Sequence, residues 1–266
     1  MTKNNSKWTN TSNSQRIHSL LQTPRAIVAW SENYPSGHLI GRHRHKRAQL
    51  LFASRGVMSV TTAEGIWVVP PLRAVWIPAQ TEHRIVCSGQ VLMRTLYVEQ
   101  DQLENPPEKC SVVSVPPLLR ELILHAVEMP RVYDTDGPDG RIAQVIIDSI
   151  QKLEVAPLDL PIPEHAKLKR IHQTLADDPA DQRTLSEWAD YVGMTSRTLA
   201  RWIKAETNLT FGQWRQQIRL LEALRRLSSK EAVTRVAVDL GYDSPSAFIA
   251  MFKKALGSTP GQYFKM

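Results

Sequence analysis

The feature that most constrains the fold of this chain is a repeat in its last third. An alanine followed four residues later by a glycine occurs at Ala189 and again at Ala237, an offset of 48 residues. The small alanine lets two helices cross closely, and the glycine, Gly193 or Gly241, can adopt the positive φ of a tight turn. A repeat at a fixed offset rarely arises by chance, so the pattern predicts two helix-turn-helix units.

Each unit also contains residues that would start and anchor its second helix. Side chains able to cap a helix N-terminus follow each glycine, namely Thr195 or Ser196 in the first unit and Asp243 or Ser244 in the second. An apolar residue, Leu199 or Phe248, then anchors the second helix on the first. Because glycine, caps and anchors occur in the same order twice, the pattern is more specific than the alanine and glycine alone.

The second helix of the first unit is predicted to enter the major groove of DNA. Arg197, Thr198 and Arg201 share one face of this helix, and Lys204 lies a turn further on. Arginine can make a bidentate contact to guanine, so this face is expected to read bases. The alternative is that these are ordinary exposed helix charges.

The second helix of the second unit presents a different face. Its exposed residues are expected to be Ser246, Ala247, Ile249 and Ala250, with Lys253 and Lys254 behind them. This face is poor in long polar side chains, so we expect phosphate and apolar contacts more than base readout. The alternative is that this helix is mainly structural.

A single connecting helix is predicted between the two units, over Phe211–Leu227. Its inward stripe contains Trp214, Ile218, Leu221 and Leu224, and its other side contains Arg215, Arg219, Arg225 and Arg226. Such a helix spans about 25 Å. With the half-units at its ends, it could hold two recognition helices about 34 Å apart, one turn of DNA.

The positive charge of the chain is concentrated at this end. The net charge is +7, with an isoelectric point near 9.5. From Tyr191 onward there are 12 Lys and Arg against 5 Asp and Glu, whereas the preceding 190 residues contain 21 of each. A basic end on a neutral body indicates a polyanionic partner, although a solvated charged surface would look the same.

The stretch from Glu164 to Lys265 resembles the DNA-binding domain of AraC/XylS-type regulators. The residues that carry the resemblance are Ala237, Gly241, Tyr242, Ser244, Phe248, Phe252, Lys253, Lys254, Gly257, Thr259, Pro260 and Tyr263. The resemblance implies two helix-turn-helix subdomains joined by a helix. It also implies DNA contacts from Arg197, Ala200, Arg201, Ser246, Ala247 and Ala250, to which we add Thr198, Lys204, Ser244 and Lys253 as candidates. The alanines cannot hydrogen bond to a base.

The rest of the chain is expected to form a second domain. Short apolar runs at Ala26–Trp30, Gln49–Ala53, Val57–Thr61, Gly65–Val69, Ala74–Ile77 and Val91–Val98 predict the strands of a small barrel or sandwich. Helical stripes follow at Leu118–Ala126 and Ile142–Leu153. We therefore predict two domains, a β-barrel followed by helices (25–155) and an all-α double helix-turn-helix domain (164–266). A flexible arm (1–24) precedes the first domain, and a proline-rich linker (156–163) joins the two.

Histidines mark a candidate site in the predicted barrel. His43 and His45, followed by Gln49, resemble the first motif of cupin-like effector domains, and Pro78–His83 resembles the second. Cupins usually have glutamate where Gln49 stands, so the site lacks an anionic ligand. His43, His45, Gln49 and His83 are the candidate ligands of a divalent transition metal, Zn, Ni, Cu or Fe. Alternatively, the histidines hydrogen bond inside the barrel or line an organic ligand's pocket, with no cofactor required.

Three further residues are candidates for an effector pocket. Trp67 and Trp76 could form its walls and Arg47 could pair with an anionic effector. Each has an ordinary alternative, because aromatic residues on strands are commonly core and arginines are commonly surface charges.

The sequence favours a cytoplasmic protein. The N-terminus has no apolar secretory segment, no run approaches the length of a membrane span, and Cys87 and Cys110 lack metal or redox spacing. The expected partner is double-stranded promoter DNA, bound by a homodimer. The two helical stripes could form the dimer face, and the alternative is that each stripe simply covers the barrel. RNA polymerase would be a further partner of an activator.

The leading functional prediction is a ligand-responsive transcription regulator and not an enzyme. By analogy with family members, its target would be a neighbouring transporter or catabolic gene. The alternative is a metal-dependent cupin enzyme such as a dioxygenase or isomerase, which would leave the repeat and the one-ended charge unexplained. A third alternative, a non-specific nucleic-acid binder, predicts equal affinity for any DNA.

Overall fold

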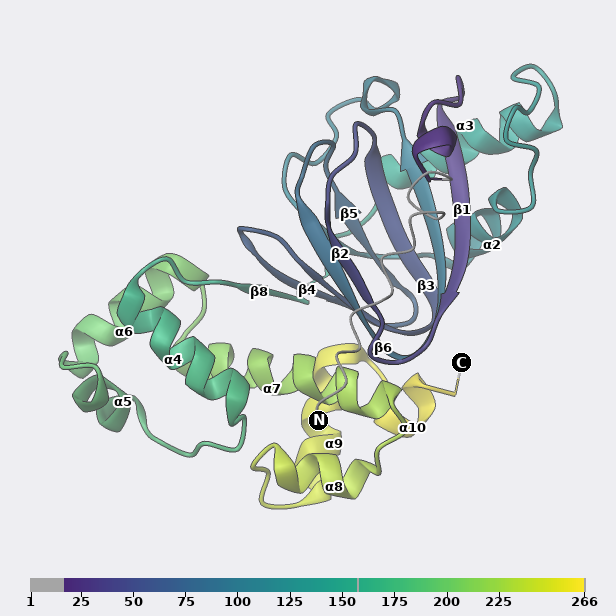
Figure 1. Ribbon diagram of the computed structural model, residues 1–266. Coiled ribbons are helices and arrows are strands. Elements are labelled where there is room, and N and C mark those ends of the chain that lie inside the picture. The colour runs from purple at the N-terminus through teal and green to yellow at the C-terminus, as the bar shows by residue number, and fades with distance from the viewer. Residues whose placement is uncertain (1–16, 157, 266) are drawn as a thin grey trace, which may run out of the picture.

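The computed structural model describes residues 17–156 and 158–265. Its first part is a sheet-rich domain with two covering helices (Figure 1). The elements are β1 (Ile27–Tyr34), β2 (Leu39–His43), β3 (Ala48–Thr61), β4 (Gly65–Val69), β5 (Arg73–Ile77), β6 (His83–Val98), the 3-10 helix η1 (Gln100–Gln102), β7 (Ser111–Ser114), α2 (Pro117–Ala126), α3 (Pro138–Gln151) and β8 (Asp159–Pro161).

The second part is helical and contains both predicted helix-turn-helix units. Its elements are α4 (Ala166–Asp177), α5 (Leu185–Tyr191), α6 (Ser196–Thr207), α7 (Phe211–Ser228), α8 (Val233–Asp239), α9 (Pro245–Leu256) and α10 (Pro260–Tyr263). The units are α5–α6 and α8–α9, and α7 connects them as expected. No helix in the described part of the chain is both long and apolar enough to cross a membrane.

The strands form one antiparallel sheet built around β3 and β6. The long strand β6 pairs with β1, β2 and β3, whereas β3 also pairs with β4 and β5. The two strands predicted at 49–53 and 57–61 are one strand, which bulges between Ala53 and Val57. Gly56 lies in this bulge with φ +80°, and an added Cβ would lie 2.6 Å from the carbonyl oxygen of Gln90. The bulge lets one strand pair with β5 before it and β4 after it.

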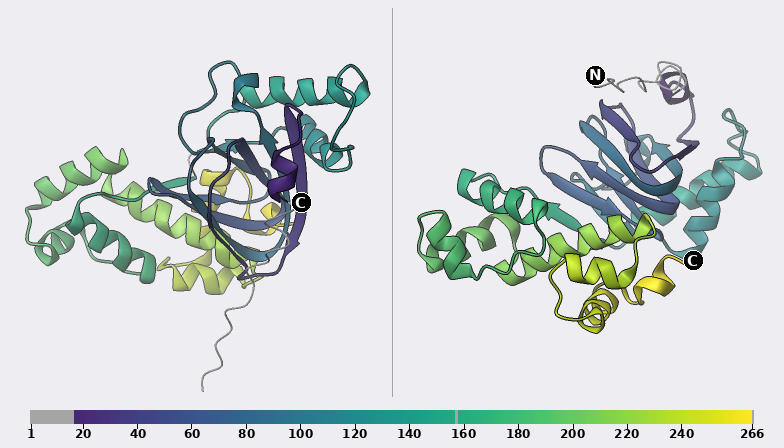
Figure 2. Two further views of the ribbon diagram at one scale, coloured as in Figure 1. Left: turned by 45° about the horizontal axis from the view of Figure 1, so that its top comes forward. Right: turned by 60° about the horizontal axis from the view of Figure 1, so that its bottom comes forward.

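The two faces of the sheet pack against different layers. Along β3, Leu51 points into the barrel, whereas Leu50 and Phe52 face outward. The outward residues form a cluster with Ile123 of α2 and Ile146 of α3. Figure 2 shows these two helices on the side of the sheet away from α4, α5 and α6.

Two predicted connecting segments are more ordered than expected. The proposed linker contains β8, which pairs with β4, with Ile66 opposite Leu160. Prolines suggested a linker, but a short edge strand tolerates proline, and Leu158 and Leu160 are buried. Residues 1–16 of the predicted arm lie outside the described residues, whereas residues 17–21 are helical. Leu20 is fully buried there, which explains why this part is held.

The helical part packs directly on the sheet. Helix α7 contacts β3 and β6, and one buried apolar cluster continues from Leu51 of the barrel to Phe248 of α9. Polar contacts join the two parts as well. The Gln217 side-chain amide donates to the Asp159 carbonyl oxygen at 3.2 Å, and the Tyr263 hydroxyl donates to that of Pro71 at 3.2 Å.

Candidate DNA-binding surface and histidine cluster

The first helix-turn-helix unit is built by local sequence as predicted. Ala189 is buried where α5 meets α6, and Gly193 has φ +62° in the turn. Thr195 is the N-cap of α6, because its hydroxyl accepts from the Thr198 backbone N–H at 3.2 Å. Leu199 is fully buried and anchors the helix. The turn and cap fix the direction in which α6 leaves α5.

Helix α6 presents two free arginines to solvent. Arg197 and Arg201 are exposed, and neither makes a hydrogen bond or an ion pair with the described residues. Lys204 is also exposed, but its Nζ donates to the Asn208 carbonyl oxygen at 2.6 Å and caps the end of the helix. Thr198 and Ala200 are half-buried. Two unpaired guanidinium groups on one helix face are able to make bidentate contacts to guanine.

The second unit repeats the geometry with a different surface. Gly241 has φ +74°, and the Ser244 hydroxyl caps α9 by accepting from the Ala247 N–H at 3.2 Å. Ser244 therefore has a structural role, whether or not it also contacts DNA. The exposed candidates on this helix are Ser246, Ala247, Ala250 and Lys253. Their small side chains allow close approach of the helix but offer few hydrogen bonds.

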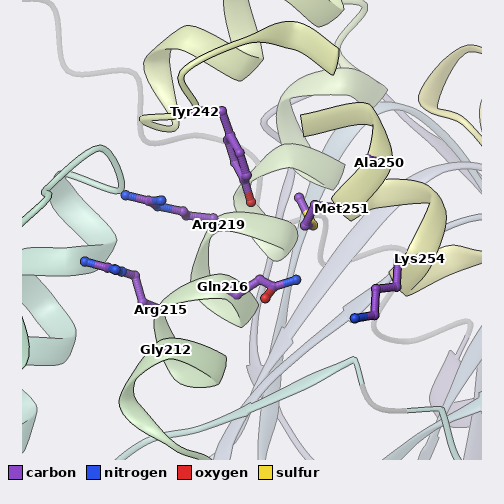
Figure 3. Close-up of a pocket in the computed structure, with 8 residues that line it drawn as sticks. All are labelled: Gly212, Arg215, Gln216, Arg219, Tyr242, Ala250, Met251 and Lys254. Carbon is purple, nitrogen blue, oxygen red and sulfur yellow. The ribbon is translucent and has the colours of Figure 1, made fainter. Parts of the chain in front are cut away.

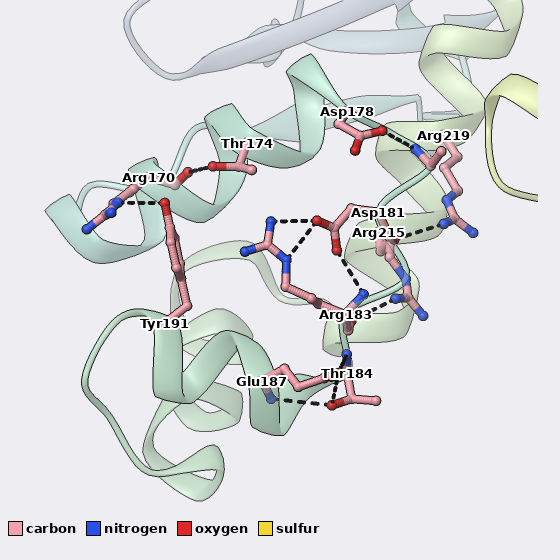
Figure 4. A network of polar contacts seen from close by, with 11 residues as sticks. Arg170, Thr174, Asp178, Asp181, Arg183, Thr184, Glu187, Tyr191, Arg215 and Arg219 are labelled. Atoms are coloured by element: carbon pink, nitrogen blue, oxygen red, sulfur yellow. Dashed lines mark hydrogen bonds and ion pairs between the residues drawn. The ribbon is translucent and has the colours of Figure 1, made fainter.

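The two units are also joined away from the connecting helix. The Gln182 amide, in the loop before α5, donates to the Gly241 carbonyl oxygen at 2.7 Å. Arg219 of α7 is buried and donates to the carbonyl oxygens of Pro179 and Asp181 at 2.7 and 3.1 Å (Figure 4). The loop over residues 178–183 therefore touches both units and α7. Sequence analysis missed this link, because it placed Arg219 among exposed charges.

Arg183 organises the same loop. Its guanidinium donates to the Asp181 carboxylate at 2.5 and 2.7 Å, and its Cζ lies 3.6 Å from the centre of the Trp188 ring. Burial alone would raise the pKa of Asp181, but the hydrogen bonds from Arg183 outweigh it and lower that pKa. Arg170 of α4 donates to the Tyr191 hydroxyl beside it (Figure 4). The loop is therefore fixed by charge and aromatic contacts.

A basic cavity lies between α7 and α9 (Figure 3). Its volume is about 420 Å³, and it is lined by Gly212, Arg215, Gln216, Arg219, Tyr242, Ala250, Met251 and Lys254. Lys254 makes no hydrogen bond or ion pair with the described residues. None of the three cations that line the cavity, Arg215, Arg219 and Lys254, is paired with a carboxylate among those residues. By contrast, Arg225 and Arg226 further along α7 are paired with acidic groups. The unpaired positive charge of α7 is therefore confined to the end near this cavity.

The three candidate histidines of the sheet-rich domain, called the sensor from here on, meet at one place. His43 ends β2 and pairs with His83 at the start of β6, and His45 follows shortly after β2. One ring nitrogen of each lies within 4.8 Å of the others. The three histidines therefore converge, with His45 just outside the strand.

Backbone carbonyl groups fix how these rings face. The Nδ1 atoms of His43, His45 and His83 donate to the carbonyl oxygens of Gly41, Arg47 and Thr81 at 2.9, 2.6 and 2.8 Å. A carbonyl oxygen only accepts, so the ring nitrogen opposite it carries a proton, and when their rings are neutral His43 and His83 have their lone pair on Nε2. This is the arrangement that orients metal-binding imidazoles. In His45 the Nε2 atom also faces an oxygen, Oε1 of Gln49 at 3.0 Å, so this nitrogen is open to a ligand only when the Gln49 side chain turns away.

Burial keeps the two inner rings neutral. It lowers the pKa of His83 to about 3 and also lowers the pKa of His45. The Nε2 atom of His83 is buried without a hydrogen-bond partner among the described residues. The Gln49 Oε1 lies 3.0 Å from His45 Nε2, and the Gln49 Nε2 donates to the Thr95 hydroxyl at 2.9 Å. Three imidazoles with an amide oxygen beside them fit a divalent transition metal, without an anionic ligand.

The candidate effector residues do not form one pocket. Trp67 lies in the cluster that fills the barrel, whereas Trp76 lies in the cluster on the outer face. Arg47 is buried, and its guanidinium donates to the carbonyl oxygens of Leu21, Thr23 and Arg25 and pairs with Glu99 at 2.8 Å. It holds the N-terminal segment, and those contacts use the donors that an anionic effector would need.

Comparisons with known proteins agree with this architecture. Residues 188–266 match a helix-turn-helix domain model, and residues 27–176 match the AraC-like ligand binding domain. The chain is 38% identical to the HTH-type transcriptional regulator NimR of Escherichia coli over 83% of this chain and 81% of that protein. It is 31% identical to the HTH-type transcriptional regulator RipA of Corynebacterium glutamicum, over 39% of this chain and 31% of RipA.

A solved structure is similar over most of the chain. Fatty-acid-bound ToxT of Vibrio cholerae is 9% identical, with a TM-score of 0.38, over 92% of this chain and 97% of ToxT. The match to the ligand-binding domain covers more than half of the present chain, and NimR is matched over most of its length. The chain therefore belongs to the AraC-type transcriptional regulators, with a ligand-binding domain ahead of a double helix-turn-helix domain.

Proposed function

We propose that this regulator reads promoter DNA with α6, anchors itself with α9, and responds to a ligand or metal held by its sensor domain. The observation that carries the proposal is the pair of unpaired, exposed arginines on α6, Arg197 and Arg201. They stand on a helix whose direction is fixed by a capped turn and by the loop at 178–183. Preorganised arginines on a recognition helix favour sequence reading over non-specific attraction.

The two helices have different tasks in this proposal. Helix α9 offers small side chains, so it contributes close packing in the groove and contacts to phosphates. Lys254 and Arg215 line the basic cavity between α9 and α7, which is suited to a backbone phosphate. Sequence would then be read mainly at the half-site under α6.

The test begins with DNA sites selected in vitro from a random pool by the full-length protein. The selected DNA should bind at least about 10³-fold tighter than scrambled DNA. Arg197→Ala and Arg201→Ala should each cost about 1–3 kcal/mol and relax the preference at one base pair. Binding is measured by fluorescence anisotropy at several salt concentrations.

A second variant separates the contacts that position the protein on DNA from the contacts that read the base sequence. Lys254→Ala should weaken binding to selected and scrambled DNA alike and reduce the salt slope by about 1, because one phosphate contact is lost. Arg225→Ala is the control, since this exposed arginine of α7 is paired with Glu222. Equal affinity for selected and scrambled DNA, unaffected by Arg197→Ala, would mean that the basic end is a non-specific clamp.

We propose further that His43, His45 and His83 hold a divalent transition metal, with Gln49 beside them. The support is the convergence of the three rings and the buried Nε2 of His83, which has no hydrogen-bond partner among the described residues. A bound metal would fix the start of β6 against the end of β2. In this proposal the metal either stabilises the sensor domain or is the signal to which the protein responds, because the protein that holds it is a transcription regulator.

A homodimer formed through α2 and α3 is part of the proposal. Leu118 and Val145 are 64% and 43% exposed on these helices and would be covered by a second copy. Pairing would place two reading helices on one promoter and increase selectivity. RNA polymerase would be a further partner if the protein activates, and a neighbouring transporter or catabolic gene is the proposed target.

A further inference from the structure

A second cavity lies on the outer face of the sensor, away from the histidines. It is bounded by β5, β7, the loop after η1 and the end of α3, and its volume is about 310 Å³. Trp76, Val113, Ile150 and Leu153 supply much of its apolar lining. Small-molecule sites are typically concave, mainly apolar and of about this size.

The aromatic wall of this cavity is fixed in place. Trp76 is 1% exposed, and its Nε1 donates to the Pro107 carbonyl oxygen at 3.0 Å. The ring therefore cannot turn away without breaking that bond. Ile150 packs in the same apolar cluster. A rigid indole beside aliphatic side chains suits the body of a small apolar molecule.

Two polar groups at the cavity have no partner among the described residues. Ser111 lines the cavity, and its buried hydroxyl makes no hydrogen bond there. Glu104 is exposed, is the only charged residue of the lining, and makes no ion pair or hydrogen bond with the described residues. An unpaired carboxylate at an apolar cavity favours a cation over an anion.

The cavity also touches the segment that leads to the DNA-binding domain. Val155 lines it and bridges to Val113 of β7. Four residues after Val155, β8 begins at Asp159, whose carbonyl oxygen accepts from Gln217 of α7. A molecule seated against Val155 would therefore press on the chain that joins sheet to connecting helix.

We propose that this cavity is an effector site for a small organic cation with an apolar body. Its ammonium group faces Glu104, and its apolar body lies against the aliphatic lining at Leu153 and Val155, with Trp76 beneath. Binding is relayed from Val155 to β8 and from β8 to α7. The relay rests on the proposed DNA-reading function, whereas the binding site does not.

The test uses three probes of one shape and different charge, with the full-length protein. Phenethylammonium, 2-phenylethanol and phenylacetate are titrated by calorimetry. The ammonium probe should bind about threefold tighter than the alcohol, as expected for a partly exposed ion pair, and phenylacetate should bind weakest. Glu104→Gln should remove the preference, whereas Glu108→Gln, an exposed acid outside the lining, should preserve it.

A cavity-filling variant gives an independent readout. Val155 is 68% exposed, so Val155→Trp should fold normally and reduce binding of all three probes. Affinity for the selected DNA should change when wild type is saturated with phenethylammonium, and not in Val155→Trp. Failure of every probe to bind wild-type protein that still binds selected DNA would overturn the site alone. Probe binding without any selected DNA would instead overturn the proposed function.

Discussion

At the scale of single residues, the histidine cluster is governed by what stands opposite each ring nitrogen. Carbonyl groups occupy every Nδ1, which leaves the Nε2 atoms of His43 and His83 for a ligand, whereas His45 Nε2 faces the Gln49 Oε1. Gln49 occupies the position where cupins usually have glutamate, so a metal here would keep its full charge. An uncompensated dication in a partly buried site is held less tightly than one with an anionic ligand.

This balance predicts how metal binding responds to substitution. His83→Gln should abolish stoichiometric Zn²⁺ binding. Gln49→Glu should tighten Zn²⁺ binding by about tenfold or more, because substitutions beside metal ligands change metal affinity on that scale. Calorimetry with Zn²⁺ and metal analysis after dialysis measure both. His38→Gln, which changes a histidine outside the cluster, is the control. Undiminished binding in His83→Gln would contradict the assignment.

At the scale of elements, the two turns of the helix-turn-helix units look alike but have different surroundings. Both glycines have positive φ. An added Cβ at Gly193 would meet only the Lys167 ammonium nitrogen, at 3.9 Å, whereas at Gly241 it would lie 2.8 Å from the Ala180 carbonyl oxygen. Only the second turn is held by a tight contact with the loop at 178–183, and we call this contact the lock.

The pair of glycines therefore offers a matched test of that lock. Gly193→Ala and Gly241→Ala should each lose about 1–3 kcal/mol of stability, because alanine is strained at positive φ. Only Gly241→Ala should also lose selected-DNA affinity, since it separates the loop at 178–183 from the second unit. Urea unfolding and anisotropy measure the two effects. Equal loss of DNA affinity in both variants would show that the lock does not set the spacing of α6 and α9.

At the scale of the whole molecule, the sensor and the DNA-binding domain share one apolar core. One close contact lies where Gly89 of β6 approaches the end of α7. An added Cβ at Gly89 would lie 2.2 Å from the Ser228 carbonyl oxygen. Such a contact leaves no room for even a methyl group, so the two domains are seated directly on each other (Figure 2).

We expect Gly89→Ala to weaken the packing between the two domains. The methyl group forces β6 away from α7, so a protease of broad specificity should cut residues 153–163 faster than in wild type. Calorimetry should show one transition for wild type and two for Gly89→Ala. Gly37→Ala is the control, because Gly37 also has positive φ but nothing lies within 4 Å of the added Cβ. Unchanged cleavage in Gly89→Ala would argue against coupling through this contact.

Local patterns predicted the helical domain well, and long-range pairing explains most of what they missed. Thr195, Ser244 and the two turn glycines act within a few residues of themselves, so sequence alone revealed them. Arg219 looked like Arg225, because only the folded loop at 178–183 distinguishes them. Strand β8 was hidden among prolines, since its pairing partner, β4, lies about 90 residues earlier in the chain. The histidines were found by motif, whereas their orienting carbonyl groups were not.

Strand β8 has a practical consequence for dividing the protein into fragments. A sensor fragment that ends before Asp159 lacks this strand, and the backbone N–H and C=O groups of β4 that it covers become an open edge. Open edges pair with strands of other molecules. Self-association of such a fragment would then report the cut edge, whereas the same measurement on a fragment reaching Pro161 would report α2 and α3.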